Sequence, residues 1–109
     1  MIGHPGAYSL AIYRGDSYSW AFRVWSDEAH TVPVDLAGVE ADAVIRAAGS
    51  HHALDVTIVL PNEVLVQLPA SVSHGLAGSG RWDLQLTYPG DIVYTLVAGS
   101  VSVAQDVTA

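Results

Sequence analysis

Cysteine and lysine are both absent from this chain of 109 residues. Without cysteine the protein can form no disulfide, no thiolate metal site and no catalytic thiol, and small secreted modules usually depend on disulfides. The chain has four arginines and 11 acidic residues, which gives a net charge of −7. A surface of that sign repels the phosphates of nucleic acids and of anionic membranes. We therefore expect neither a nucleic acid nor a membrane as partner.

Long apolar runs are also missing, although 50% of the residues are hydrophobic. No stretch approaches the length of a membrane-spanning helix, and the first residues lack the basic and apolar regions of a secretion signal. The length suits one domain with a core large enough to fold. We expect a single domain over residues 1–109, with short terminal arms, made in a cytoplasm.

Apolar residues recur at every second position, which is the period of a β-strand with one buried face. The runs cover residues 18–24, 39–47, 54–60, 64–68, 82–88 and 92–103. An early strand over residues 7–13 and a short one at residues 32–34 complete the series. Trp20 and Trp82 lie in the inward register of their strands and are predicted to be core residues.

Turn-forming residues separate these runs. Pro61-Asn62 and Pro89-Gly90-Asp91 are short enough to close hairpins, and Gly49-Ser50-His51 marks a third turn. Residues 69–76 are the helix candidate, since Pro69 can start a single turn and Gly75 can end it. Together these signals predict an all-β fold: a two-sheet antiparallel Ig-like β-sandwich of about seven to nine short strands with one short helical crossover.

Residues suited to catalysis or metal binding are scattered through the sequence. His51, His52 and Asp55 could ligate a metal, but neighbouring strand residues point to opposite faces, so a solvated turn is the simpler interpretation. Calcium would need loop carboxylates, for which the sequence offers Asp16, Asp91 and Asp106. No phosphate-binding loop and no nucleophile motif occurs. We predict no catalytic, cofactor-binding or metal site, and no enzymatic activity.

The outward register of the strands is less polar than a solvated face should be, and lysine, the usual guard of sheet edges, is missing. Either the outward residues are covered within the domain, or the register is shifted, or neighbouring molecules bury them. Trp25, out of register with Trp20, would make a good interface anchor if it is exposed at a strand end; the equal alternative is a position covered by the loop at residues 32–36. The candidate interface residues are Trp25, Val44, Val59, Val93, Val97, Gln105, Asp106 and Val107.

Several short motifs follow one another in a recognisable order. Arg14-Gly15-Asp16 opens an aromatic strand; residues 33–38, 43–46, 67–70, 80–86, 99–103 and 105–108 follow. In this order the chain resembles small β-sandwich domains of tailed-bacteriophage virions. It looks most like the long-tail-fibre-connector type of actinobacterial phages, and it is similar to the N-terminal sandwich of baseplate upper proteins. The resemblance covers most of the chain and carries over no catalytic residues.

This resemblance implies a structural protein of the virion, a tail or baseplate adaptor present in several copies. Its partners would be copies of itself and other virion proteins, reached through the terminal arms and the outward valines. A capsid decoration protein is one alternative. The other is a carbohydrate- or host-surface-binding module, which would use Trp25 and Tyr8 or Tyr13 as sugar platforms.

The tripeptide Arg14-Gly15-Asp16 is also the sequence that integrins bind on adhesive proteins. In the phage pattern it is a turn before the aromatic strand. Gly15 would supply a backbone angle that other residues avoid, and the Asp16 carboxylate would accept hydrogen bonds from the following amides. We therefore expect a structural turn and no integrin binding.

Overall fold

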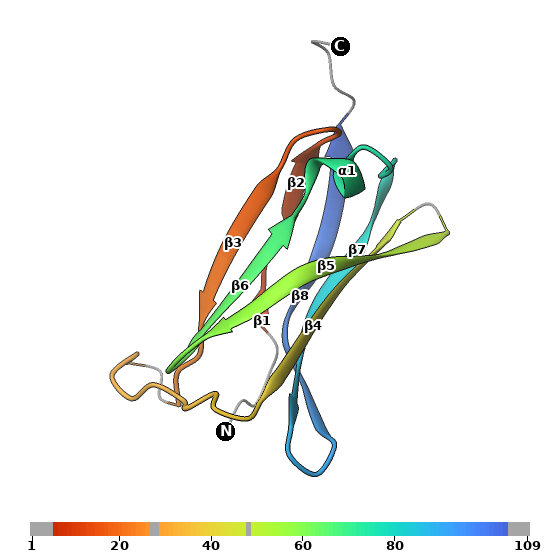
Figure 1. Ribbon diagram of the computed structural model, residues 1–109. Coiled ribbons are helices and arrows are strands. Elements are labelled where there is room, and N and C mark those ends of the chain that lie inside the picture. Colours follow the sequence, from red (N-terminus) through yellow and green to blue (C-terminus); the bar gives the residue numbers. More distant parts are fainter. Residues whose placement is uncertain (1–5, 27–28, 48, 105–109) are drawn as a thin grey trace.

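The computed structural model describes residues 6–26, 29–47 and 49–104. Within these ranges the chain forms eight strands and one short helix (Figure 1). They are β1 Gly6–Ala7, β2 Leu10–Tyr13, β3 Tyr18–Arg23, β4 Glu40–Ala47, β5 Ser50–Val59, β6 Glu63–Leu68, α1 Ala70–Ser73, β7 Ser79–Tyr88 and β8 Ile92–Ala104. The predicted all-β fold with a single-turn crossover helix is confirmed. The described part contains no helix long and apolar enough to span a membrane.

The strands form one curled sheet where two separate antiparallel sheets were expected. The order is β1-β8-β7-β4-β5-β6-β3, with β2 also beside β8. Residues 50–54 of β5 pair with β4, and residues 55–59 pair with β6. Both short N-terminal strands run parallel to β8. Because β5 pairs with both β4 and β6, it joins the two halves into one half-barrel. The strand direction is mixed, since β1 and β2 are parallel to β8 and the other pairs are antiparallel.

The hydrophobic core fills the inside of this half-barrel. The alternation predicted for β4, β6 and β7 is confirmed, since the inward positions are buried throughout β6 and in most of β4 and β7, with Ala41, Gly80 and Tyr88 half-buried. Trp82 is 1% exposed at the centre of the core, as predicted, and Trp20 packs against the core from β3. Each fully buried large side chain contributes about 1.5–3 kcal/mol, so these alternating residues are the main stabilising element.

The first strand is interrupted at Tyr8, where one continuous strand was expected. Gly99 of β8 lies so close to Tyr8 that a Cβ at this glycine would overlap the Tyr8 carbonyl oxygen. That oxygen accepts a hydrogen bond from Trp82 Nε1 at 2.7 Å, in place of a bond within the ladder. The break therefore satisfies the one polar group of the buried indole.

A β-bulge changes the register of β8. Leu84 lies opposite Val97 and Gln85 lies opposite Thr95, so Leu96 is the extra residue. Beyond the bulge the alternation reverses, and Val97 turns into the core with 7% of its surface exposed. The prediction of Val97 as an outward interface residue is therefore wrong, because an inserted residue moves every later side chain to the other face.

Residues 24–26 and 29–39 lie in loop segments that cover one end of the half-barrel. The strand predicted at residues 32–34 is reduced to a single bridge between Trp25 and Pro33. Instead, the loop is fixed to the turn between β5 and β6. Val24 N donates to Asn62 O at 2.8 Å, the buried Asn62 side chain donates back to Val24 O at 3.1 Å, and Leu36 N donates to Pro61 O at 2.8 Å.

Strands β2 and β3 are the two edges of the half-barrel, and side chains bridge the opening between them. The main chain of Tyr13 donates to the phenol oxygen of Tyr18 at 2.9 Å. The ring of Tyr8 meets Phe22 edge-on, with centroids 5.6 Å apart. The aromatic residues of β3 thus close the opening by packing, without a strand ladder.

Candidate functional site

The molecule is elongated, with extents of 45 × 25 × 21 Å. We call one end the loop end; it consists of residues 29–39, 59–62 and 88–93. The opposite end, called the turn end, consists of residues 13–17 and 70–78 (Figure 1). Strand β8 connects the two, from Ile92 at the loop end to Ala104 at the turn end.

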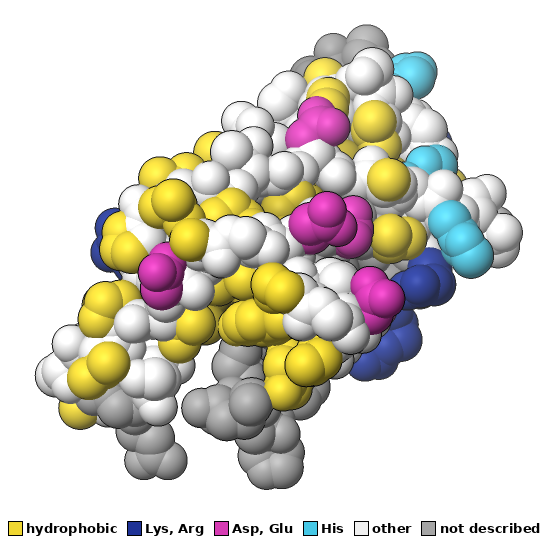
Figure 2. All heavy atoms as spheres, turned by 60° about the horizontal axis from the view of Figure 1, so that its bottom comes forward, with side chains coloured by type: hydrophobic (Ala, Val, Ile, Leu, Met, Phe, Trp, Pro, Cys, Tyr) yellow, Lys and Arg dark blue, Asp and Glu magenta, His cyan; other side chains and the backbone are white. Residues whose placement is uncertain are grey.

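Most of the exposed large hydrophobic side chains lie at the loop end. Between 43% and 58% of the surface of each is exposed; they are Val32, Val59, Leu60, Ile92 and Val93. Figure 2 shows hydrophobic side chains spread over this face among acidic ones. Apolar side chains gathered on one end of a small domain are typical of a surface that binds another molecule.

Trp25 also lies at this end of the molecule, beside the loop end. It is half-buried, and its ring stacks on that of the exposed His30 with centroids 5.6 Å apart and planes 16° apart. His30 has a φ of 56°, a backbone angle that few non-glycine residues adopt. The loop therefore covers part of the tryptophan and leaves the rest accessible.

The hairpin between β7 and β8 projects beyond the rest of the sheet. Pairing of β4 with β7 begins at Glu40 and Thr87, so residues 88–92 extend past β4 (Figure 1). A shallow hollow of about 220 Å³ lies between the two, lined by Gly38, Glu40, Thr87, Tyr88, Pro89, Gly90 and Asp91. Two carboxylates make this hollow acidic.

Two tyrosines support the base of the hairpin. Tyr88 and Tyr94 pack edge to face, with ring centroids 5.5 Å apart and planes at 89°. Burial raises the pKa of Tyr88 above its usual value of 10.0, and the nearby Tyr94 raises this pKa further. The ring contact joins β7 to β8 at the base of the hairpin.

At the turn end, Arg14-Gly15-Asp16 forms a tight turn. Asp16 N donates to Tyr13 O at 3.1 Å, and Gly15 has a φ of 98°, so the predicted role of the glycine is confirmed. The hydroxyl of Ser73, a buried residue of α1, accepts from Gly15 N at 2.9 Å and donates to Asp16 O at 2.7 Å. We expected the Asp16 carboxylate to accept the hydrogen bonds that hold this turn. In the structure the main-chain N–H and carbonyl of Asp16 make the bonds instead.

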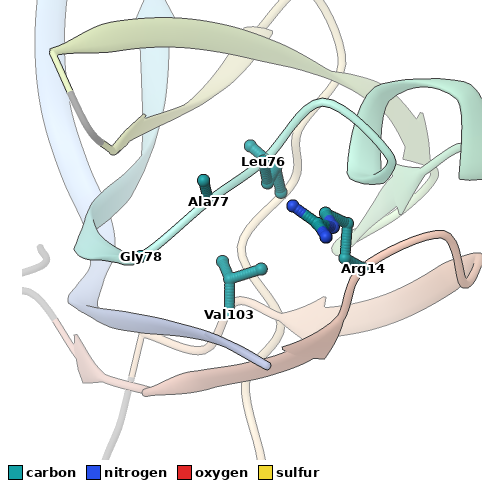
Figure 3. A pocket seen from close by; sticks show the side chains of 5 residues that line it. All are labelled: Arg14, Leu76, Ala77, Gly78 and Val103. Atoms are coloured by element: carbon teal, nitrogen blue, oxygen red, sulfur yellow. The ribbon is translucent and has the colours of Figure 1, made fainter. Parts of the chain in front are cut away.

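The Arg14 side chain points into a hollow of about 250 Å³ at the turn end. Leu76, Ala77, Gly78 and Val103 line the hollow beside it (Figure 3). Arg14 forms no ion pair with any described residue, whereas Arg23 pairs with Glu63 at 3.5 Å and Arg46 pairs with Asp83 at 3.1 Å. The hollow thus combines one positive charge with main-chain groups and a few small apolar side chains.

The remaining predicted residues are distributed over the whole molecule. Val59 and Val93 lie at the loop end, while Val44 is half-buried on β4. Gln105, Asp106 and Val107 fall outside the described residues. His51, His52 and Asp55 lie on β5 itself, and the described residues contain no group of three possible metal ligands. Asp16 and Asp91 lie at opposite ends and cannot share a calcium ion.

No protein-family model and no curated protein sequence matches this chain. Among solved structures, the chain is similar to part of an endo-fucoidan hydrolase from glycoside hydrolase family 107, with a TM-score of 0.51 and 11% sequence identity. The match covers 93% of this chain and 13% of the hydrolase chain. At this identity the similarity concerns the fold alone.

Proposed function

We propose that the protein is a non-enzymatic structural protein of a bacteriophage virion, a tail or baseplate adaptor that binds neighbouring subunits. The observation that carries this proposal is the concentration of exposed apolar side chains at the loop end of a small β-rich domain. The order of sequence motifs described above supports the same assignment. In this proposal the half-barrel corresponds to the Ig-like β-sandwich of such adaptors, with β5 shared by both sheets.

The adaptor would act by binding alone. The loop end offers apolar side chains on a fixed base, since hydrogen bonds attach Val24 to Asn62 and Leu36 to Pro61 in the β5–β6 turn. Burying apolar surface contributes about 25 cal/mol per Å² to the free energy of binding. The entropy cost of ordering the loop is small, because hydrogen bonds already hold it. Val59, Val93 and Trp25 would lie in or beside the contact.

Immunogold labelling of purified particles with an antibody to this protein tests the proposal. Label on the tail or the tail tip is the expected result. Label spread over the head would replace the adaptor with a capsid decoration protein. If no particle carries label, the assignment to the virion is wrong.

Glycan binding is the second candidate function, and two exposed tyrosines favour it. Tyr8 is 45% and Tyr13 is 56% exposed, and aromatic faces are common platforms for ligands with an apolar side. The fold neighbour is a polysaccharide hydrolase, although the similarity extends over a small part of it. A glycan array probed with the isolated domain would show binding that Tyr13→Ala abolishes; the adaptor proposal predicts none.

We further infer that Arg14-Gly15-Asp16 serves the fold of this protein and not cell adhesion. The Gly15 amide is bound to Ser73, and the Arg14 side chain points into its own hollow. The two charged side chains are therefore not presented together on a free loop. Animal cells are expected to attach to a surface coated with the protein no better than to one coated with the Asp16→Glu variant.

A further inference from the structure

We propose that copies of this chain bind one another head to tail, with the loop end of one copy docked on the turn end of the next. The inference rests on the proposed function, which requires several copies, and it names the partner of the loop end. The central contact is Asp91 of one copy against Arg14 of its neighbour.

The two ends of the molecule carry hollows of similar size and opposite charge. The hollow at the turn end, about 250 Å³, contains the Arg14 side chain. The hollow at the loop end, about 220 Å³, contains Glu40 and Asp91. Strand β8 runs from one hollow to the other along the long axis of the molecule (Figure 1). The two hollows therefore lie at opposite ends, and each copy can bind one neighbour at each end.

The projecting hairpin fits this geometry because its tip combines a carboxylate with apolar side chains. Ile92 and Val93 follow Asp91 and are exposed. The receiving hollow offers a smaller apolar surface beside the Arg14 guanidinium, from the half-buried Val103 and the exposed Ala77, while Leu76 forms its buried floor (Figure 3). Docking would place apolar surface on apolar surface and give Arg14 an anionic partner, which lowers the cost of covering its charge.

The distribution of charge disfavours contacts between two like ends. Asp35, Glu40 and Asp91 are exposed at the loop end, while Arg23 is already paired with Glu63. Two loop ends would therefore repel each other, and like charges facing across an interface cost several kcal/mol. At the turn end the exposed Asp16 offsets the charge of Arg14, so this end lacks the net negative charge of the loop end, and the Arg14 side chain in its hollow is the group that can attract a carboxylate. A contact between different patches is heterologous, and it builds a ring or a filament according to whether the rotation closes.

The test uses sedimentation velocity of the full chain at increasing concentration. The wild type is expected to form dimers and larger species, more weakly as the salt concentration rises. Arg14→Gln and Asp91→Asn should each weaken self-association about tenfold or more. Asparagine suits position 91 because it tolerates the φ of 62° found there. Arg81→Gln and Asp55→Asn are the controls, since they change the net charge equally and line neither hollow.

Mixing the two variants gives the decisive result. The Arg14→Gln copy keeps an intact loop end and the Asp91→Asn copy keeps an intact turn end, so an equimolar mixture should form one-to-one heterodimers that do not grow. A mixture that stays monomeric overturns head-to-tail binding, and so does a wild type that is monomeric at every concentration. Controls that weaken association as much as the test variants overturn the role of the hollows.

The outcome is separable from that of the labelling experiment. Self-association of the pattern described, with unlabelled particles, would support the head-to-tail contact and refute the virion assignment. Labelled tails with a monomeric protein in solution would support the virion assignment and overturn the head-to-tail contact.

Discussion

Ser73 makes the attachment of the β2–β3 turn to α1 testable by a single substitution. Its side chain is fully buried, accepts a hydrogen bond from Gly15 N and donates one to Asp16 O. Ser73→Ala removes one oxygen atom and leaves both main-chain groups without a partner. The added cavity is small, so the loss of stability measures the two hydrogen bonds.

The expected loss follows from the environment of these groups. Leaving a buried polar group unpaired costs about 1–3 kcal/mol. Gly15 is half-buried and Asp16 is exposed, so water can partly replace the lost partner, and a total of about 2–3 kcal/mol is expected. Ser71 lies on the same helix and is exposed. Ser71→Ala gains the same helix propensity, at most about 0.5 kcal/mol, and serves as the matched control.

Urea denaturation followed by tryptophan fluorescence measures the difference. With a slope of roughly 1–3 kcal/mol per molar urea, Ser73→Ala should lower the midpoint by about 1 M or more, while Ser71→Ala should leave it unchanged or raise it slightly. Amide exchange at Gly15 should accelerate in the first variant alone. Equal midpoints and equal exchange in the two variants would refute the view that Ser73 holds the turn.

Three further predictions concern the strands. Gly99→Ala should destabilise by about 3 kcal/mol or more, because its Cβ would overlap the Tyr8 carbonyl oxygen; Gly6→Ala, with its nearest neighbour at 3.6 Å, is the control in the same thermal denaturation. Trp82→Phe should cost about 2–3 kcal/mol through lost packing and an unpaired Tyr8 oxygen, measured by urea titration. The folded-state pKa of Tyr88 is raised, so the stability contributed by its neutral form is complete below pH 10 and lost as pH rises through that pKa. Tyr88→Phe should therefore flatten the alkaline decline in the unfolding free energy, and an unchanged decline would contradict this.

The strand faces could be predicted because a half-buried strand requires period two in its sequence. Val64, Val66 and Leu68 occupy alternate positions of β6, and all three are buried, while Leu65 and Gln67 on the other face are not. The hairpins could also be predicted from the sequence, since Pro61-Asn62 and Pro89-Gly90-Asp91 have strong turn preferences. Which strands pair with each other could not be predicted from such local patterns. Nothing in the sequence near β1 or β2 indicates that both lie parallel to β8, because strand pairing over such separations depends on the whole chain.

The candidate site was predicted in part. Val59 and Val93 were expected to face outward and are exposed. Leu60 ends the run over residues 54–60 and Ile92 begins the run over residues 92–103, and alternation within these runs places both inward. Both are exposed, because Leu60 lies in a turn and Ile92 on a hairpin that projects beyond β4. Ser73 was missed, since a serine in a short helix gives no sign that it is buried. Alternation predicts which residues are buried inside a sheet, but it does not predict burial where the neighbouring strand ends.

The misplacement of Val97 has a different cause, and the sequence of β8 contains a signal for it. The strand is 13 residues long, and Leu96 and Val97 are adjacent large apolar residues, so simple alternation must expose one of them. A bulge at Leu96 resolves the conflict: Val97 and Val101 then share the inner face, and Gly99 between them allows Tyr8 to approach. The same register places Trp82 opposite Gly99, where its indole reaches the Tyr8 oxygen. In β8 the adjacent pair Leu96-Val97, followed two residues later by Gly99, is therefore the sequence feature that marks the bulge and the close contact with Tyr8.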